Sequence, residues 1–173
     1  MKSKKKLGII IYARMNSRRL PNKVLKKIFD KTLLEIVYLR VKKKSFAIPI
    51  IVNTSKSKSD DKIVNFCKKN KIKFYRGMLD NVVDRTIACC KKFNLNSFVR
   101  ICADRPFFDY NLMKKMIRIF LRNNYDIVTN QFPKVCPKGL ACEVASLKVF
   151  DDLKSKKISK IDEEHIFNYF YKN

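Results

Sequence analysis

Five polar residues follow the first apolar run of the chain within one short loop. The apolar run is Leu7 to Tyr12, and the residues are Arg14, Ser17, Arg18, Arg19 and Lys23. An arginine side chain matches phosphate oxygens with a fork of donors, and a lysine adds a point charge. Together with the backbone N–H groups of the loop, these side chains suit a polyphosphate. A solvated basic turn accounts for the composition equally well.

The loop also occupies a favourable position for binding. A short apolar run bounded by loop residues is typical of a buried strand. A chain that begins with a strand and then a loop suits an α/β sheet, in which ligands bind beyond the carboxyl ends of the strands. We therefore predict that the basic loop lies at the ligand-binding edge of a sheet.

A carboxylate follows another predicted strand, which covers Ser97–Cys102. The residues after it are Ala103, Asp104 and Arg105. A carboxylate at the end of a parallel strand is well placed to hold a cation over a phosphate, because Mg²⁺ takes one or two protein carboxylates together with phosphate oxygens and water. We expect Asp104 to be the metal ligand. Asp109 precedes a helical apolar pattern and is expected to cap that helix.

Apolar periodicity predicts alternating helices and strands along the rest of the chain. The predicted elements are a helix over Leu33–Val41 with Thr32 as its N-cap, a strand over Ile48–Val52, a helix opened by Asp60 and Asp61, a strand over Lys73–Tyr75, a helix ending at Phe93, a strand over Asp126–Thr129, a strand at Glu143 and a helix over Leu147–Leu153. This alternation predicts a three-layer α/β fold with a mostly parallel sheet.

The composition is that of a folded domain. The 173 residues are enough for one domain with a sizeable core. A hydrophobic content of 46% with three glycines and five prolines argues against disorder. No apolar run reaches membrane-spanning length, and the start lacks a separate apolar segment with a cleavage site. We expect no membrane insertion and a cytoplasmic location.

The net charge of +25 raises the question of nucleic acid as a partner. Of the 40 basic residues, ten are arginine and the lysines are spread through nearly every predicted helix and turn. A dedicated phosphate-tracking surface would be more clustered and richer in arginine. We therefore expect nucleic acid to bind only through non-specific, salt-sensitive attraction.

The six cysteines form no C-x-x-C pair, and four of them fall on apolar positions. Unpaired cysteines in an intracellular chain are usually small core residues, and the ligand clusters of a zinc site are missing from the sequence. We interpret them as structural.

The spacing in the basic loop resembles a known signature. Ala13-Arg14-x-x-Ser17-x-Arg19-Leu20-Pro21-x-Lys23 after a strand resembles the loop of the sugar-acid cytidylyltransferases, which include CMP-Kdo synthetase, the CMP-sialic acid synthetases and the spore-coat polysaccharide type. In that family the loop wraps the triphosphate of CTP. The spore-coat type usually has glycine where Asn16 and Asn22 stand. Asparagine tolerates left-handed backbone, so the turns remain feasible.

Two further segments resemble the nucleotide side of the family's site. Arg76-Gly77-x-x-Asp80-Asn81-Val82-Val83-Asp84-Arg85 resembles the segment that approaches the base and ribose. The resemblance implies that Arg76, Asp84 and Arg85 line that side of the pocket. It also gives Tyr12 and Ala13 a place in nucleotide binding. A solvent-exposed Asp84–Arg85 pair is an open alternative.

The segment Ala103-Asp104-x-Pro106 resembles the family's strand end, where this aspartate binds the catalytic metal. The resemblance places Ala103 beside the nucleotide and gives Asp104 the Mg²⁺. It also implies that Arg105 reads a group of the substrate.

Two segments resemble the family's acceptor side. Lys138-Gly139-Leu140-Ala141-Cys142-Glu143 resembles a glycine–leucine turn into an acidic strand, with Ala141 where aspartate is usual. The resemblance implies a place for Glu143 on the sugar side, and a structural strand glutamate is an equal alternative. Glu164 and His165 resemble a Glu-His segment of the spore-coat type. They are candidates for the same side, with a surface or helix-cap position as the alternative.

The resemblance implies a single Rossmann-like (GT-A-like) nucleotidyltransferase domain over residues 1–173, with an α/β/α arrangement. Its partners would be CTP and a sugar acid, its cofactor Mg²⁺, and its catalytic residues Arg14, Lys23 and Asp104. Family members continue with a segment that supplies a second metal carboxylate, so this sequence is expected to be a short form or a fragment. A homodimer is compatible with this prediction.

Two alternatives stay open. A glycosyltransferase of similar architecture normally carries an Asp-x-Asp motif, which this sequence lacks. A non-catalytic module that binds nucleotide or nucleic acid is the other.

Overall fold

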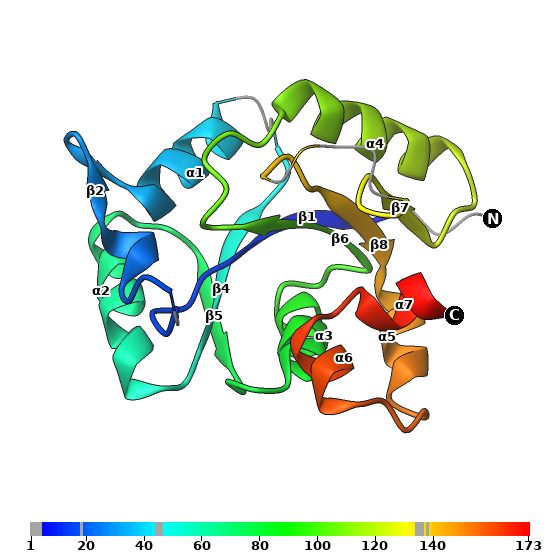
Figure 1. Ribbon diagram of the computed structural model, residues 1–173. Coiled ribbons are helices and arrows are strands. Elements are labelled where there is room, and N and C mark those ends of the chain that lie inside the picture. The colour runs from blue at the N-terminus through cyan, green and yellow to red at the C-terminus, as the bar shows by residue number, and fades with distance from the viewer. Residues whose placement is uncertain (1–4, 18, 44–46, 134–136, 138) are drawn as a thin grey trace.

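A six-stranded sheet forms the centre of the protein in a computed structural model that describes residues 5–17, 19–43, 47–133, 137 and 139–173 (Figure 1). Its strands lie in the order β5-β4-β1-β6-β8-β7. Their bounds are β1 Leu7–Tyr12, β4 Ile50–Ser55, β5 Phe74–Gly77, β6 Ser97–Cys102, β7 Ile127–Thr129 and β8 Glu143–Ser146. Strands β5, β4, β1 and β6 are parallel, whereas β8 is antiparallel to both β6 and β7. The predicted mostly parallel sheet is confirmed.

Helices cover both faces of this sheet (Figure 1). Their bounds are α1 Leu33–Lys42, α2 Asp61–Lys69, α3 Val82–Lys92, α4 Tyr110–Arg122, α5 Leu147–Leu153, α6 Lys160–Glu164 and α7 Asn168–Lys172, with short 3₁₀ turns at Lys23–Leu25 and Lys58–Asp60. A small separate hairpin joins β2 Lys27–Ile28 and β3 Lys31–Thr32.

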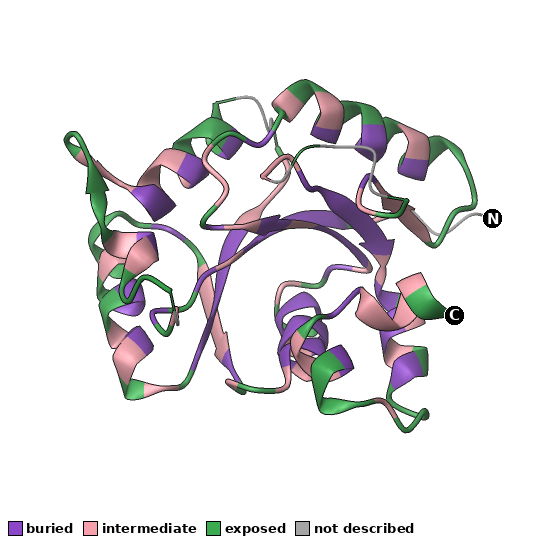
Figure 2. Ribbon diagram, in the orientation of Figure 1, coloured by how far each residue is buried: buried purple, intermediate pink, exposed green. Residues whose placement is uncertain are grey.

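Alternate residues of β1 enter two different cores. Ile9 and Ile11 pack with α1, α2 and α4 on one face, while Ile10 packs with α3 and α5 on the other. Successive side chains of a strand point to opposite faces, so a strand buried on both sides is apolar throughout. The purple central strands of Figure 2 show this double burial. The three-layer α/β/α arrangement therefore follows from the unbroken apolar run of β1.

Strand β4 differs from its predicted bounds. The prediction covered Ile48–Val52 and stopped at the polar residues after it, whereas the strand runs from Ile50 to Ser55. Asn53, Thr54 and Ser55 are fully buried because β5 pairs alongside them. The polar side chains misled the prediction, since pairing with a distant strand decides where a strand ends.

The predicted caps are present at two helices. The backbone N–H of Glu35 donates to the Thr32 hydroxyl at 3.2 Å, which caps α1. Asp109 accepts from the N–H of Asn111 at 2.7 Å and of Leu112 at 3.2 Å, which caps α4. Both contacts satisfy N–H groups that a helix start leaves unpaired.

The cysteines within the described residues are free thiols, and all except Cys102 are buried. Burial raises the pKa of Cys67 and of Cys89 to about 12. The buried cysteines are core residues, as predicted, whereas Cys102, which was also predicted at an apolar position, is partly exposed. Cys136 lies outside the described residues. In the same part of the chain, no helix is long and apolar enough to cross a membrane.

Candidate functional site

The basic loop leaves the carboxyl end of β1, where the strand order reverses. Strands β4 and β5 lie on one side of β1, and β6, β8 and β7 lie on the other. In open α/β sheets ligands bind at such a switch point. The Ala13 N–H donates to the Asn53 carbonyl at 3.1 Å, and the Ala103 N–H donates to the Tyr12 carbonyl at 2.9 Å. These two hydrogen bonds join the carboxyl ends of β4, β1 and β6 next to the loop.

An ion pair joins the basic loop to the strand-end carboxylate. Lys23 Nζ lies 2.5 Å from Asp104 Oδ2, and both side chains are partly exposed. Lys23 begins the 3₁₀ turn that closes the loop, and Asp104 follows β6 directly. The two residues are 81 positions apart in sequence. The structure therefore brings the predicted phosphate-binding lysine and the predicted metal ligand together.

A second ion pair joins the loop to the C-terminal helices. Arg14 Nη1 lies 2.8 Å from Glu164 Oε1, with both side chains more than two-fifths exposed. Glu164 is the last residue of α6, and the exposed His165 follows it as the C-cap. His165 thus takes the helix-cap position that was the alternative to a sugar-site role.

The loop itself is folded around Met15. The Met15 side chain is buried in the core, and its carbonyl accepts from the N–H groups of Ser17 at 2.9 Å and Asn22 at 3.1 Å. Asn22 has a φ of 59°, the left-handed conformation that asparagine was expected to tolerate. Arg19 is exposed, and Arg18 lies outside the described residues.

Asp60 was missed as a site residue by the sequence prediction, which placed it only at the start of a helix. Its buried carboxylate accepts from the Met15 N–H at 2.7 Å and the Ser55 N–H at 3.1 Å, and the Ser55 hydroxyl also donates to it. Its side chain makes no capping bond to α2. The pair Asp60-Asp61 before a helix signals a cap, so the sequence contained no sign of this contact.

Arg76 points to the segment that follows β4. Its guanidinium donates to the carbonyls of Ser55 at 2.9 Å and Ser57 at 3.1 Å, and lies 2.7 Å from Asp61 Oδ1. Arg76 was predicted to line the base side of the pocket. In the structure its guanidinium binds residues 55–61.

The alternative of a solvent-exposed Asp84–Arg85 pair is wrong. Asp84 Oδ1 lies 3.0 Å from Lys154 Nζ, whereas the Arg85 side chain is buried. Arg85 Nη1 donates to the Met78 carbonyl at 2.8 Å, and burial lowers the pKa of its guanidinium. Adjacent residues of a helix point in different directions, about 100° apart, which separates the two charges.

Tyr12 lies on the face of the sheet that α3 covers. Its hydroxyl is 2.8 Å from that of Thr86, and burial raises the pKa of the phenol well above its usual value. The guanidinium of Arg100 stacks over the Tyr12 ring, 5.7 Å from its centre. The neutral Tyr12 side chain therefore packs between the end of β1 and α3.

Glu143 forms a buried polar network with residues from three other elements. Its Oε1 lies 2.9 Å from Arg100 Nη1 and accepts from the Tyr171 hydroxyl at 3.1 Å, which is itself 3.1 Å from the Thr129 hydroxyl. The other oxygen, Oε2, is buried and has no hydrogen-bond partner among the described residues. Arg100 was missed by the prediction, although an arginine inside the apolar run SFVRIC is a usable signal.

Arg105 follows Asp104 and is half-buried. Its Nη1 is buried and has no hydrogen-bond partner within the described part of the chain. A buried donor without a partner costs free energy that a ligand acceptor would recover. This geometry is compatible with the expected contact between Arg105 and a substrate group.

The carboxylates of the site are dispersed. Among the described residues, no three His, Cys, Asp or Glu side chains gather so that they could hold a metal ion by themselves. Asp104 is thus a single carboxylate beside a lysine. A cation here would need most of its oxygen ligands from a bound phosphate.

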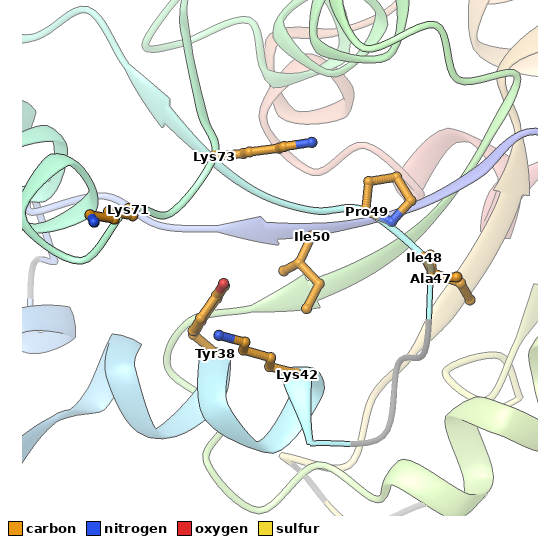
Figure 3. A pocket seen from close by; sticks show the side chains of 8 residues that line it. All are labelled: Tyr38, Lys42, Ala47, Ile48, Pro49, Ile50, Lys71 and Lys73. Carbon is orange, nitrogen blue, oxygen red and sulfur yellow. The ribbon is translucent and has the colours of Figure 1, made fainter.

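A hollow of about 310 Å³ lies at the opposite edge of the sheet (Figure 3). It is lined by Tyr38, Lys42, Ile48, Ile50, Lys71 and Lys73, among others. Helices α1 and α2 both end there, and cations near helix C-termini compensate the carbonyl ends of the helix dipole. The position of these lysines is therefore accounted for by their interaction with the helix C-termini. We place the functional site at the carboxyl ends of the strands, where the basic loop lies.

The fold is that of a nucleotidyltransferase of Rossmann-like type. A solved cytidylyltransferase from Leptospira borgpetersenii superposes with a TM-score of 0.92 and 31% identity, covering 98% of this chain and 72% of that one. The profile of the family described as cytidylyltransferase matches residues 8–173. The chain belongs to the cytidylyltransferase family.

Three relatives illustrate its place in the family. An uncharacterised protein of Methanocaldococcus jannaschii is 35% identical over 95% of this chain and 66% of its own length. The spore coat polysaccharide biosynthesis protein SpsF of Bacillus subtilis is 28% identical over 90% of this chain and 65% of its own. The 3-deoxy-manno-octulosonate cytidylyltransferase of Rickettsia felis is 30% identical over 71% and 50%. This chain thus spans about half to just under two thirds of the length of these relatives.

Proposed function

We propose that the protein transfers CMP from CTP to a sugar acid and releases pyrophosphate, in the synthesis of a surface polysaccharide or glycan precursor. The observation that carries the proposal is the 2.5 Å contact between Lys23 and Asp104, which unites the phosphate loop with the strand-end carboxylate. Family membership supports the nucleotide, and the names of two relatives support a sugar acid and a polysaccharide product.

The side chains of the loop would act on the phosphates. An oxygen of the acceptor attacks the α-phosphorus, loses its proton, and displaces pyrophosphate, so negative charge grows on the leaving group. Arg14, Arg19 and Lys23 would neutralise that charge, which is the main contribution a protein makes to transfer of this kind. No nucleophilic side chain is needed. In the structure Arg14 and Lys23 are held by Glu164 and Asp104, so binding requires these two cations to exchange carboxylates for phosphate oxygens.

Magnesium fits this arrangement if the bound triphosphate supplies the remaining oxygen ligands. Asp104 offers one carboxylate at the strand end, and Mg²⁺ at phosphate sites often takes one or two carboxylates with phosphate oxygens and water. The residue that would hold the ion is therefore Asp104, with the triphosphate completing its oxygen shell. Bound there, Mg²⁺ would supply positive charge beside the phosphates.

The first test concerns the nucleotide. With Mg²⁺ present, CTP should raise the melting temperature more than ATP or GTP does, since a ligand of the native state stabilises it by mass action. Equal shifts for all triphosphates would indicate attraction to a +25 surface and would contradict the proposal.

The second test concerns the reaction. Pyrophosphate release should depend on CTP and on one member of a panel of sugar acids, and Asp104→Asn should remove the dependence on Mg²⁺ with the fold intact. Arg19→Ala should weaken CTP binding about ten- to a hundred-fold, the usual effect of losing a charged hydrogen bond. CTP binding without turnover on any acceptor would favour a binding module instead.

A further inference from the structure

We propose that Asp60 and Arg76 are positioning residues that set the conformation of the phosphate loop without touching the nucleotide. This inference rests on the proposed function insofar as the loop binds phosphate. Its observations are separate, because they concern how the loop is held in the protein.

One backbone carbonyl, that of Met15, joins two separate parts of the loop. The Met15 carbonyl accepts from the N–H groups of Ser17 and Asn22, which lie near the two ends of the turn. The Met15 side chain is 2% exposed and lies in the same core cluster as α1 and α2. Contacts that fix the position of Met15 therefore also constrain Ser17 and Asn22, the loop residues that bond to its carbonyl.

Asp60, the last residue of the 3₁₀ turn that follows β4, binds Met15. Its Oδ1 accepts from the Met15 N–H at 2.7 Å, while Oδ2 accepts from the N–H of Ser55 at 3.1 Å and from the Ser55 hydroxyl. The residue is 1% exposed, so water does not compete for these bonds. One carboxylate thus ties the end of β4 to the centre of the phosphate loop.

Asp60 cannot act by contacting the phosphates. Its side chain is negatively charged and acceptor-only when ionised, so it would repel a triphosphate. Asp60 can favour binding only by positioning the loop, whereas its negative charge disfavours binding of an anion. Removal of the charge alone would strengthen anion binding, whereas removal of the positioning contact would weaken it.

Arg76 fixes the segment that carries Asp60. Its guanidinium binds the carbonyls of Ser55 and Ser57 and the carboxylate of Asp61, so it holds the turn on both sides of Asp60. The resulting chain of contacts runs from Arg76 through residues 55–61 to Met15. Residues acting in one such chain give non-additive effects when they are changed together.

The test measures binding of tripolyphosphate and of CTP, each with Mg²⁺, by calorimetry. Asp60→Asn keeps the shape, but its amide can accept from only one side, so we expect the Kd for tripolyphosphate to rise about 10- to 100-fold, the range for losing a charged hydrogen bond to a backbone group. Asp151→Asn is the matched control. It removes the same charge from the exposed pair between Asp151 of α5 and Lys91 of α3, and it should change the Kd less than about twofold.

Arg76→Ala should weaken tripolyphosphate and CTP by the same factor. The double variant Arg76→Ala/Asp60→Asn should bind no worse than Asp60→Asn alone. If Arg76 instead touched the base or ribose, its loss would weaken CTP and leave tripolyphosphate unchanged, which would overturn its positioning role. A protein that binds tripolyphosphate but does not prefer CTP would refute the proposed function and leave this inference standing.

A folded Asp60→Asn variant that binds tripolyphosphate as tightly as the natural protein, or more tightly, overturns the inference. So does a natural protein that does not bind tripolyphosphate. Should Asp60→Asn fail to fold, amide hydrogen exchange on the natural protein decides. The Met15 amide should be protected without ligand, and exchange at the rate of an open loop would overturn the proposal.

Discussion

Replacement of Glu143 by alanine should destabilise the protein strongly. The change leaves the Arg100 guanidinium without the carboxylate 2.9 Å away and removes an acceptor from Tyr171. The Glu143 side chain is 3% exposed and that of Arg100 is 19% exposed, so water replaces the lost partner poorly. Loss of one member of a buried ion pair typically costs about 3–5 kcal/mol, and the partial exposure of Arg100 places the expected value near 3 kcal/mol.

The assay is thermal unfolding followed by circular dichroism. For a domain of this size, a loss of about 3 kcal/mol corresponds to a fall in melting temperature of about 6–12 °C. Glu164→Ala is the matched control, because its pair with Arg14 is well exposed on both sides and such pairs contribute about 0–1 kcal/mol. The double replacement Arg100→Met/Glu143→Leu should recover much of the loss, since apolar residues of similar volume can replace a buried pair.

A cost for Glu143→Ala no larger than that for Glu164→Ala would refute this reasoning. The same variants separate the two roles considered for Glu143. If Glu143 is purely structural, its replacement by alanine leaves the KM for the acceptor unchanged at temperatures where the variant is folded. If Glu143 Oε2, which has no partner among the described residues, binds a sugar hydroxyl, the replacement raises that KM.

Three further outcomes are expected. Cys67 and Cys89, whose thiol pKa burial raises to about 12, should resist alkylation at pH 8 until the protein is unfolded; mass mapping that finds them labelled in the native state would contradict their burial. Gly77→Ala should cost about 1–3 kcal/mol in thermal unfolding, because its Cβ would lie 2.5 Å from Arg85 Cγ, and an unchanged melting temperature would show that Arg85 can move aside. Hydrogen bonds from Ser159 and Asn168 lower the pKa of Asp162 below 3.8, so its stabilisation is present above that pH and lost as pH falls through the lowered pKa; Asp162→Asn should flatten this part of the acid-unfolding curve.

Much of the fold could be predicted from local patterns. Strand β1 was predicted with its observed bounds. A strand that is buried on both faces is apolar throughout, so its own residues identify it without knowledge of the strands beside it. The caps Thr32 and Asp109 were also predicted, since a cap and the N–H it binds lie within three residues of each other. Both kinds of signal are local in sequence.

Contacts between distant segments could not be predicted in the same way. The prediction ended β4 at Val52, because only the pairing with β5 reveals that the following polar residues belong to the strand. A solvent-exposed pair of Asp84 and Arg85 was an open alternative, but Arg85 is buried and bonds to the Met78 carbonyl, while Asp84 pairs with Lys154. In each case the deciding partner lies on another element.

The sequence by itself determined the chemistry available at the site: a basic loop after one strand and a carboxylate after another. Only the tertiary structure decided that Lys23 and Asp104 meet, since strands β1 and β6 are neighbours in the sheet although more than eighty residues separate them in the chain. It also decided that Asp60 accepts from Met15 instead of capping its own helix. The physical reason is that residue types and periodicity are local properties, whereas the choice of hydrogen-bond partner for a buried charge depends on which strands pack side by side.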